Sequence, residues 1–389
     1  MIYLDNAATS FPKPPQVYRA MDEFFRHRAA NPGRAGYRLS TEAEREVEGT
    51  RKILADLFGA SEPERMIFTL NATDAINMAL KGLLREGDHV VTSDLEHNSV
   101  TRPLRGLEKR GAISVTRVNA SQEGILDPQA VKQAVGPQTR LIVITHASNV
   151  LGTIQPIKEI GRLAREKGLV FMVDAAQSAG VWPISVEDDL IDLLAFTGHK
   201  GLFGPPGTGG LYVGKRAEIL PWREGGTGTD SESPIHPEEM PFRLEGGTPN
   251  FLGITGLKTG AEFISKTGMD NIRHHGRQLL TAILNGIKGD DRFILYGPSE
   301  PSDTNDRLPI VSLNIKGLEP SVAGGILDET YGIAARSGLH CAPLTHQCIG
   351  SFPQGTLRIS PGYFNTEDDI SQLTSALKEI ASSVNAAAK

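Results

Sequence analysis

An apolar run that turns polar at its end, Leu193-Leu194-Ala195-Phe196-Thr197-Gly198-His199-Lys200-Gly201, leads into a stretch rich in glycine and proline, residues 201–210. The pattern predicts a buried strand that ends just before Lys200. A lysine at the end of a buried strand can be desolvated, which disfavours its charged form and makes its amine a nucleophile for a carbonyl. We therefore expect Lys200 to be a reactive group.

Another buried strand, ending in the carboxylate of Asp174, is predicted by a second run of the same kind. This run is Val170-Phe171-Met172-Val173-Asp174-Ala175-Ala176-Gln177. A site for pyridoxal 5'-phosphate (PLP) needs a lysine that bonds the aldehyde and an acid that pairs with the pyridine nitrogen. Lys200 and Asp174 could supply both groups and create an electron sink. Two solvated polar residues at strand ends are the plainer alternative, so the prediction depends on the other strand-end groups.

The composition is that of an ordinary soluble globular enzyme. The chain has 389 residues, 39% hydrophobic and 22% charged, which is enough for a large core and two domains. A net charge of −6 does not suggest a nucleic acid or an anionic membrane as a partner, and no apolar run approaches a membrane span. The N-terminus has no signal-peptide pattern, and two cysteines form no disulfide framework. We expect a cytoplasmic protein with free thiols.

Strand-like and helix-like segments alternate over the first two-thirds of the chain. This alternation predicts an α/β fold with a mostly parallel sheet and helices on both faces. Such sheets bind ligands at the carboxyl ends of their strands, where the polar residues of interest all fall. The predicted strands are 65–70, 89–93, 113–118, 141–145, 169–174 and 193–197, and the helices between them include 74–84, 98–110, 128–135 and 156–167.

Other segments break this alternation. Thr41 and Glu44 are placed as a capping box for a helix over 41–58, which should end at Gly59. Residues 225–249 lack periodicity and predict a long functional or interface loop. A long helical region, about 254–287, then leads into a smaller α+β domain. The predicted strands of that domain lie near 293–296, 309–315, 333–336 and 356–359, and its final helix covers about 366–384.

A phosphate site is predicted where Asn71-Ala72-Thr73-Asp74 joins a strand to a helix. Free N–H groups at the helix N-terminus and the Thr73 hydroxyl would cradle a phosphate, and Thr197 and His199 could add donors. A simple helix cap is the alternative.

His97 follows another strand, and its imidazole could stack on a cofactor ring and carry protons. A purely structural histidine is the alternative there.

Cys341 leaves a predicted strand in Arg336-Ser337-Gly338-Leu339-His340-Cys341-Ala342. A thiol on a mobile polar loop can become a thiolate and attack, whereas a buried cysteine would be inert. We favour the reactive interpretation because its neighbours are small and polar. Cys348 is interpreted as structural, and the spacing of Cys341, His346 and Cys348 fits no common zinc pattern, so we expect no metal.

Arg358 lies in Thr356-Leu357-Arg358-Ile359-Ser360, a predicted strand with apolar residues on both sides. An inward guanidinium there needs an anion. A bidentate bond to the α-carboxylate of a substrate would suit its planar fork, and an internal salt bridge is the alternative.

Taken together, these motifs make the chain similar, over essentially its whole length, to the cysteine desulfurase and selenocysteine lyase family. That family lies within the class V aminotransferases of PLP fold type I. The stretches that carry the resemblance are Tyr3-Leu4-Asp5-Asn6-Ala7-Ala8-Thr9, Thr145-His146-Ala147-Ser148-Asn149-Val150-Leu151-Gly152-Thr153, Val173-Asp174-Ala175-Ala176-Gln177, Thr197-Gly198-His199-Lys200, Glu245-Gly246-Gly247-Thr248-Pro249-Asn250 and the segment around Cys341.

The resemblance implies a role for each matching position. Lys200 would hold PLP covalently, Asp174 would pair with the pyridine nitrogen, and Gln177 would bond the ring hydroxyl. His97 would stack on the ring. Cys341 would be the nucleophile that accepts sulfur. Further implied cofactor contacts are Ala72, Thr73, Asn149, Thr197, His199 and, from the other subunit of a homodimer, Thr248; the implied substrate contacts are Arg34, Asn149 and Arg358.

The implied activity is conversion of L-cysteine to L-alanine, with sulfur transferred to Cys341 as a persulfide and then to an acceptor protein. A selenocysteine lyase, which releases selenide and alanine from L-selenocysteine, is the nearest alternative, because no residue decides between sulfur and selenium. An aminotransferase for a small amino acid would need Lys200 and Asp174 but no cysteine. A PLP-binding or sulfur-carrier scaffold without turnover is the non-enzymatic alternative.

The segment around Cys341 resembles the second group of desulfurases, whose catalytic loop is short. Residues 31–38 depart from that group where it often carries histidines, and Ala72 and Thr197 replace a more usual Thr and Ser.

The resemblance also implies three parts of the chain. Residues 1–14 would pack with the small domain, residues 15–256 would form a large PLP-binding domain with a mostly parallel seven-stranded sheet, and residues 257–389 would form the small domain that carries Cys341 and Arg358.

Overall fold

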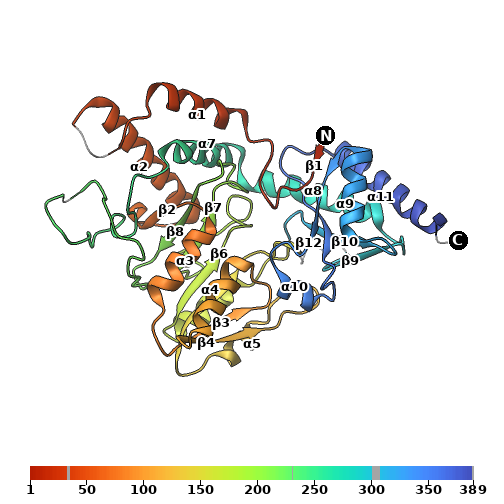
Figure 1. Ribbon diagram of the computed structural model, residues 1–389, viewed down its shortest axis with the longest axis horizontal. Helices are drawn as coiled ribbons and strands as arrows, with labels where there is room; N and C mark the ends of the chain where they lie inside the picture. The colour runs from red at the N-terminus through yellow and green to blue at the C-terminus, as the bar shows by residue number, and fades with distance from the viewer. Residues whose placement is uncertain (33–35, 230, 300–306, 388–389) are drawn as a thin grey trace.

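A mixed seven-stranded sheet flanked by helices forms the larger part of the protein in a computed structural model (Figure 1), which describes residues 1–32, 36–229, 231–299 and 307–387. The strand order is β2-β8-β7-β6-β5-β3-β4, and only β8 runs antiparallel to its neighbours among the described strands of this sheet. The strands are β2 (Met66–Thr69), β3 (Asp88–Ser93), β4 (Ile113–Val118), β5 (Thr139–Thr145), β6 (Val170–Asp174), β7 (Leu193–Thr197) and β8 (Gly209–Val213).

Alternate side chains of the central strands point into two separate cores. In β5, Ile142 and Ile144 pack in one hydrophobic cluster, whereas Leu141 and Val143 pack in the other. Successive side chains of a strand point to opposite faces of the sheet, and here both faces pack against a hydrophobic cluster. The strands are therefore continuous apolar runs in the sequence. The helices of this part are α1 (Pro15–His27), α2 (Arg38–Phe58), α3 (Ala72–Leu83), α4 (Asn98–Lys109), α5 (Pro128–Ala134), α6 (Ile157–Glu166) and α7 (Phe251–Thr267), with a short 3-10 turn at Pro63–Arg65.

The strand of the large sheet that the residue pattern did not predict is β8, which begins inside the glycine-rich stretch. Gly209 and Gly210 suggested a loop, but they pair with β2 and β7. A Cβ added at Gly210 would lie 2.3 Å from the ring of Phe196. Glycine is therefore required here by close packing of a strand against an aromatic side chain, not by a turn.

One helix prediction was wrong at its start. The helix predicted from Thr41 begins at Arg38, and Tyr37 caps it without a side-chain hydrogen bond, so no capping box forms at Thr41. It ends at Gly59, as predicted, where a φ of 64° suits glycine. The long helical region predicted over about 254–287 consists of two helices, α7 and α8 (Met269–Ile287), which Gly268 separates with a φ of 84°.

The smaller part contains a four-stranded antiparallel sheet of order β12-β13-β10-β9. Its strands are β9 (Phe293–Tyr296), β10 (Val311–Ile315), β12 (Arg336–Gly338) and β13 (Thr356–Ile359). The strand predicted near 333–336 is divided between β11 (Ile333–Ala334) and β12. The helices are α8, α9 (Pro320–Tyr331), α10 (Pro343–Cys348) and α11 (Glu367–Ala387).

The N-terminal strand β1 (Ile2–Tyr3) pairs in parallel with β11 in the smaller part. Leu4 is completely buried there, in the same cluster as residues of α8, α9 and α11. Figure 1 accordingly shows the N-terminus beside α8 and α9. These contacts support the proposed association of residues 1–14 with the small domain.

The proposed boundary after residue 256 falls inside α7. That helix packs against α1 and α2, and its buried residues Ile254 and Ile264 belong to a core of the large sheet. We therefore propose that the large domain extends to Gly268, where the chain turns into α8.

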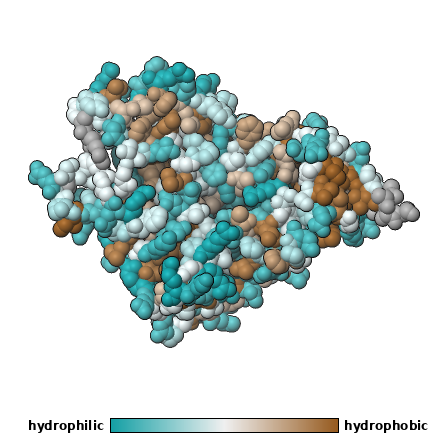
Figure 2. Space-filling model, in the orientation of Figure 1, coloured by the Kyte–Doolittle hydropathy of each residue, from teal (hydrophilic) through white to brown (hydrophobic). Residues whose placement is uncertain are grey.

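The long loop predicted over residues 225–249 lies within residues 214–250, which have no helix or strand in their described part. Figure 1 shows this segment, in green, reaching out beyond α2. On the face shown in Figure 2, hydrophobic residues occur in small groups among polar ones. No helix in the described ranges combines the length and the apolar character needed to cross a membrane.

Candidate active site

Polar side chains from several strand ends meet around one cavity of about 320 Å³ at the carboxyl edge of the sheet. β6 ends at Asp174, β7 ends at Thr197, and His97 lies in the turn between β3 and α4. Because the carboxyl ends of parallel strands share one edge, this is where such residues should meet. The sequence-predicted residues that line the cavity are Ala72, Thr73, His97, Asn149, Asp174, Gln177, Thr197, His199, Lys200 and Arg358.

One end of the cavity is the N-terminus of α3. The side chain of Asn71 caps this helix by accepting a 2.9 Å hydrogen bond from the backbone N–H of Asp74. The N–H groups of Ala72 and Thr73 come before the first intrahelical bond, and both residues line the cavity. Together with the helix dipole, they make this end suitable for an anion such as a phosphate.

Asp174 lies at the floor of the cavity and is 3% exposed. One carboxylate oxygen accepts a 2.9 Å hydrogen bond from the N–H of Ala176. Burial raises the pKa of Asp174, and this hydrogen bond and the charge of Lys200 act in the opposite direction. A cationic ring nitrogen placed beside Asp174 would favour its ionised form further.

Lys200 faces the cavity, but protein atoms crowd its side chain. Burial lowers the pKa of Lys200 to about 8, and the nearby charge of Arg358 acts in the same direction. A substantial fraction of the amine is therefore neutral near that pH, as a nucleophile for an aldehyde requires.

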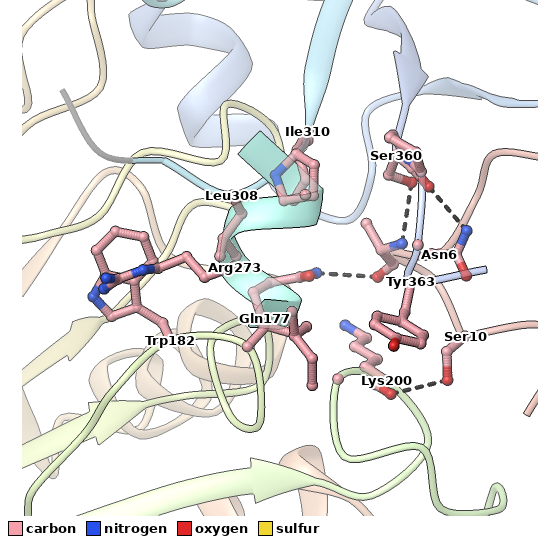
Figure 3. A pocket seen from close by; sticks show the side chains of 18 of the residues that line it. Asn6, Ser10, Gln177, Trp182, Lys200, Arg273, Leu308, Ile310, Ser360 and Tyr363 are labelled. Atoms are coloured by element: carbon pink, nitrogen blue, oxygen red, sulfur yellow. Dashed lines mark hydrogen bonds between the residues drawn. The ribbon is translucent and has the colours of Figure 1, made fainter. Parts of the chain in front are cut away.

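The N-terminal segment fixes the backbone next to Lys200, a role that the residue pattern did not reveal. The carbonyl of His199 accepts hydrogen bonds from the N–H of Ser10 at 3.0 Å, the hydroxyl of Thr9 at 3.0 Å and the ammonium of Lys13 at 2.6 Å. The hydroxyl of Ser10 donates to the carbonyl of Lys200 at 2.9 Å (Figure 3). The lysine is thus held at its backbone by residues almost 190 positions earlier in the chain.

His97 presents its ring to the cavity in a defined orientation. Its Nδ1 accepts a 3.0 Å hydrogen bond from the N–H of Ser99. Burial and the cations around it, Lys200 first among them, lower the pKa of His97 to about 4. The ring is therefore neutral at physiological pH. The preceding residue, Glu96, is buried and accepts from Ser93 and from the N–H of Thr145, which ties this turn to two strand ends.

Arg358 on β13 reaches the opposite end of the cavity and is 1% exposed. Its Nη2 donates to the Asp5 carboxylate at 2.7 Å, and its Nη1 donates to the Asn149 carbonyl at 3.0 Å. The internal salt bridge considered for Arg358 is therefore present, and the guanidinium also lines the cavity. Arg336, paired with Arg358 across β12 and β13, adds a second guanidinium that residue patterns did not single out.

Cys341 is exposed and directly follows His340, which lines the cavity, but Cys341 itself is not one of the lining residues. Its carbonyl accepts a 2.7 Å hydrogen bond from the N–H of Asn98, and the carbonyl of His340 accepts one of 2.7 Å from the side chain of Asn149. His340 and Cys341 adopt φ values of 48° and 59°, in the left-handed region. Two strained residues held by two hydrogen bonds from the large domain give the thiol loop a definite position.

Three other sequence-predicted residues lie apart from the cavity or outside the description. Thr248 is exposed and lines a different hollow, together with Glu245 and Asn250. Arg34 lies outside the described residues. Cys348 lies on α10 near the carbonyls of Ala120 and Ser121, and burial raises the pKa of its thiol to about 11.

A second, mainly apolar cavity of about 90 Å³ adjoins the first, and Figure 3 shows side chains that line it. Ala7, Gln177 and Lys200 line both cavities and so form the wall between them. Gln177 donates a 3.1 Å hydrogen bond to the carbonyl of Ala7 across this wall. The orientation of Gln177 is thus determined by the N-terminal segment as well.

Comparison with known proteins assigns this arrangement to a family. The model of the family described as Aminotransferase class-V matches residues 2–373. A probable cysteine desulfurase of Methanothermobacter thermautotrophicus is 39% identical over 98% of this chain and 94% of its own length, and one of Pyrococcus abyssi is 36% identical over 99% and 95%. The chain belongs to the cysteine desulfurase family.

A solved structure of a desulfurase supports the fold of this family member. The apo structure of cysteine desulfurase from Thermococcus onnurineus NA1 has a TM-score of 0.91 and 33% identity, covering 98% of this chain and 95% of that chain. The predicted family and the predicted PLP fold type I are confirmed.

Class V aminotransferases are PLP-dependent enzymes, and the residues of this cysteine desulfurase fit that cofactor. The cavity joins an anion-binding helix N-terminus, a lysine with a lowered pKa and a buried carboxylate whose pKa is raised. A phosphate, an aldehyde and a protonated ring nitrogen are the groups that these three features would satisfy. Within the described residues, no group of three or more His, Cys, Asp and Glu side chains is arranged to hold a metal ion.

Proposed function

We propose that this protein is a PLP-dependent cysteine desulfurase that converts L-cysteine to L-alanine and takes the sulfur onto Cys341 as a persulfide. The observation that carries this proposal is the fixed position of the exposed Cys341 directly after His340, which lines the same cavity as Lys200, Asp174 and Arg358. A simple aminotransferase would need the cavity but would have no use for an exposed thiol fixed beside it.

The cofactor would be held along its whole length. Lys200 would bond its aldehyde, Asp174 would pair with its ring nitrogen, and Gln177 would bond its ring hydroxyl. His97 would stack on the ring. When bound, PLP supplies a conjugated system that stabilises negative charge next to the substrate amine. Its phosphate would be bound by Ala72, Thr73, Thr197 and His199.

The substrate would be oriented by its carboxylate. Arg358 offers a buried guanidinium, and Asn149 lies beside it. Arg34 remains a proposed substrate contact whose position lies outside the described residues. Lys200, with a pKa of about 8, is suited to remove the α-proton and return it, and neutral His97 can carry a proton at the same cavity wall.

Sulfur transfer then requires a nucleophile on the other side of the substrate. The Cys341 thiolate attacks the substrate sulfur, so an S–S bond forms and the bond between that sulfur and the β-carbon breaks. The electron pair of the broken bond remains with the β-carbon, which takes up a proton and becomes the methyl group of alanine. The exposure of Cys341 supports onward transfer of the sulfur to an acceptor protein.

A homodimer and a cytoplasmic location remain part of the proposal. In the single chain, Thr248 lies at a separate hollow, so it could contact the phosphate only by reaching into a partner subunit. Mass measurement in solution, together with the PLP affinity of Thr248→Ala, tests this point.

The decisive experiment compares the two cysteines of the chain. Alanine release from L-cysteine and from L-selenocysteine is measured for the holoenzyme, for Cys341→Ala and for the matched control Cys348→Ala. We expect Cys341→Ala to lose turnover of L-cysteine and Cys348→Ala to retain it. Full cysteine turnover without Cys341 would show that the nucleophile is wrong. Selenocysteine turnover that survives Cys341→Ala, with negligible wild-type turnover of cysteine, would assign the protein as a selenocysteine lyase.

A further inference from the structure

The guanidinium proposed to bind the substrate already holds a carboxylate of the protein itself. Asp5 lies 2.7 Å from Nη2 of Arg358, and the two residues are 353 positions apart in the chain. Arg358 is almost completely buried, whereas the side chain of Asp5 is 20% exposed. The pair therefore joins the N-terminal segment to β13 at the substrate end of the cavity.

The backbone of Asp5 is held in place by several contacts. Its carbonyl accepts a 3.0 Å hydrogen bond from the N–H of Ala8 and one of 3.1 Å from the hydroxyl of Tyr3. The residue also forms an isolated bridge with Ser360, two positions after Arg358. The pairing of two backbone segments thus places Asp5 within reach of Arg358.

We propose that Asp5 is a positioning residue that orients Arg358 and weakens its hold on amino-acid carboxylates, so that L-alanine leaves readily. This inference rests on the proposed function, because it assumes that the carboxylates of substrate and product bind Arg358. A ligand carboxylate on the same guanidinium would lie close to the Asp5 carboxylate. Two like charges in a poorly solvated site repel each other, and the repulsion acts on substrate and product alike.

The same pair explains why the protein keeps a residue that opposes ligand binding. Burying a guanidinium without a counter-ion is costly, and Arg336 and Lys200 add positive charge near Arg358. Asp5 offsets that cost in the empty site. A bound carboxylate would take over part of this task, so the energy of binding and the stability of the empty protein are linked through Asp5.

The test uses Asp5→Asn, which keeps the shape and the hydrogen-bond acceptor but removes the charge. Asp5→Glu keeps the charge and serves as a second variant. Asp22→Asn is the matched control, because it removes the same charge from an exposed pair with Arg26 on α1. For each holoenzyme, we measure kcat and KM for L-cysteine and the inhibition constant of L-alanine, with L-alaninamide as a probe that lacks the carboxylate.

We expect Asp5→Asn to lower the inhibition constant of L-alanine roughly tenfold and to lower KM with it, because the repulsion is gone. kcat should not rise, because product leaves more slowly. Asp22→Asn should match the wild type, and Asp5→Glu, which keeps the charge, should show no gain in affinity for L-alanine. L-alaninamide should bind weakly to every form and should not gain from Asp5→Asn. L-alanine should also raise the melting temperature of Asp5→Asn more than that of the wild type, which loosened packing alone would not produce.

The outcomes separate the two proposals. If L-alanine and L-alaninamide inhibit both the wild type and Asp5→Asn equally, no carboxylate site exists, and both the assignment of Arg358 and the role of Asp5 fail. If the wild type prefers L-alanine but Asp5→Asn binds it equally or more weakly, the role of Asp5 is overturned while Arg358 remains the carboxylate site.

Discussion

The side-chain amide of Asn149 donates a 2.7 Å hydrogen bond to the backbone carbonyl of His340, the residue before Cys341. A side chain proposed to contact cofactor and substrate therefore also holds the loop that presents the thiol. The backbone carbonyl of Asn149 in turn accepts from Arg358. The carboxylate end of the site and the position of the nucleophile are thus joined through one residue.

Replacing Asn149 by alanine should free this loop. The His340 carbonyl loses its partner, so we expect Cys341 to react about fivefold faster with iodoacetamide, which is the effect of losing one net hydrogen bond. Mass spectrometry of the native protein over time measures the rate. Asn271→Ala removes an exposed amide–carbonyl bond of the same 2.7 Å length and should leave the rate unchanged. An equal rate in Asn149→Ala and the wild type would contradict the tether.

The left-handed backbone at Cys341 should reverse the usual order of glycine and alanine. Its φ of 59° is strained for any residue with a Cβ. We therefore expect Cys341→Gly to be more stable than Cys341→Ala by about 1 kcal/mol. Urea unfolding of the two variants, both without the thiol, gives the difference. A Cys341→Ala protein at least as stable as Cys341→Gly would mean that the loop relaxes out of this conformation.

Lys200 should make the stability of the protein without PLP depend on pH. Its pKa is lowered from 10.5 to about 8 in the folded state, first by burial. Between these two values, the unfolded chain binds more protons than the folded one, so the contribution of Lys200 to stability rises with pH over that interval. Lys200→Met should therefore be more stable than the wild type at about pH 7, and the difference should shrink towards about pH 10.

Urea unfolding of the two PLP-free proteins at both pH values checks this expectation. Lys13, whose pKa burial also lowers to about 8, is present in both proteins and cancels in the comparison. A stability difference that does not change with pH would show that the Lys200 ammonium is not destabilised by folding.

The pair of Arg51 and Glu245 should be a major anchor of the segment that carries Thr248. Arg51 is 1% exposed and donates to both carboxylate oxygens of Glu245, at 2.9 and 3.1 Å. The same carboxylate accepts from the N–H of Phe68 at 2.6 Å. Glu245→Gln leaves the buried guanidinium with only the more exposed carboxylate of Glu48, 3.3 Å from its Nε, as a counter-ion, and we expect it to lower the free energy of unfolding by about 3 kcal/mol.

Urea unfolding measures this loss, and Asp22→Asn again supplies the control. Its exposed pair with Arg26 should be worth less than about 1 kcal/mol. An equally small effect for Glu245→Gln would show that the Arg51 guanidinium is stabilised by other groups.

Much of the site could be predicted because its geometry follows from strand ends. Asp174 and Lys200 come at the ends of neighbouring parallel strands. Residues in such positions lie close together irrespective of the conformation of the loops. The residue pattern could not predict β8. Its glycines are needed for close packing against Phe196, and a glycine required for packing cannot be distinguished in the sequence from a glycine required for a turn. The start of α2 was missed for a related reason, since Tyr37 caps it without any side-chain signal.

Contacts between segments that are distant in the sequence could not be predicted from local sequence motifs. Ser10 and Lys13 have no motif that points to the carbonyls of His199 and Lys200, and Asp5 has none that points to Arg358. Such pairs depend on how β1 and β13 are brought together in space. They become visible only when the tertiary structure is known.

The pairing of β1 with β11 also determines when the protein can finish assembling. Ile2 and Tyr3 are synthesised long before their partners Ile333 and Ala334. The βα units around Asp174 and Lys200 are local enough to form during synthesis, whereas the contact of Asp5 with Arg358 must wait until a residue 353 positions later has been made. A partly synthesised chain could thus form the sheet that holds the cofactor before it can recognise an amino acid.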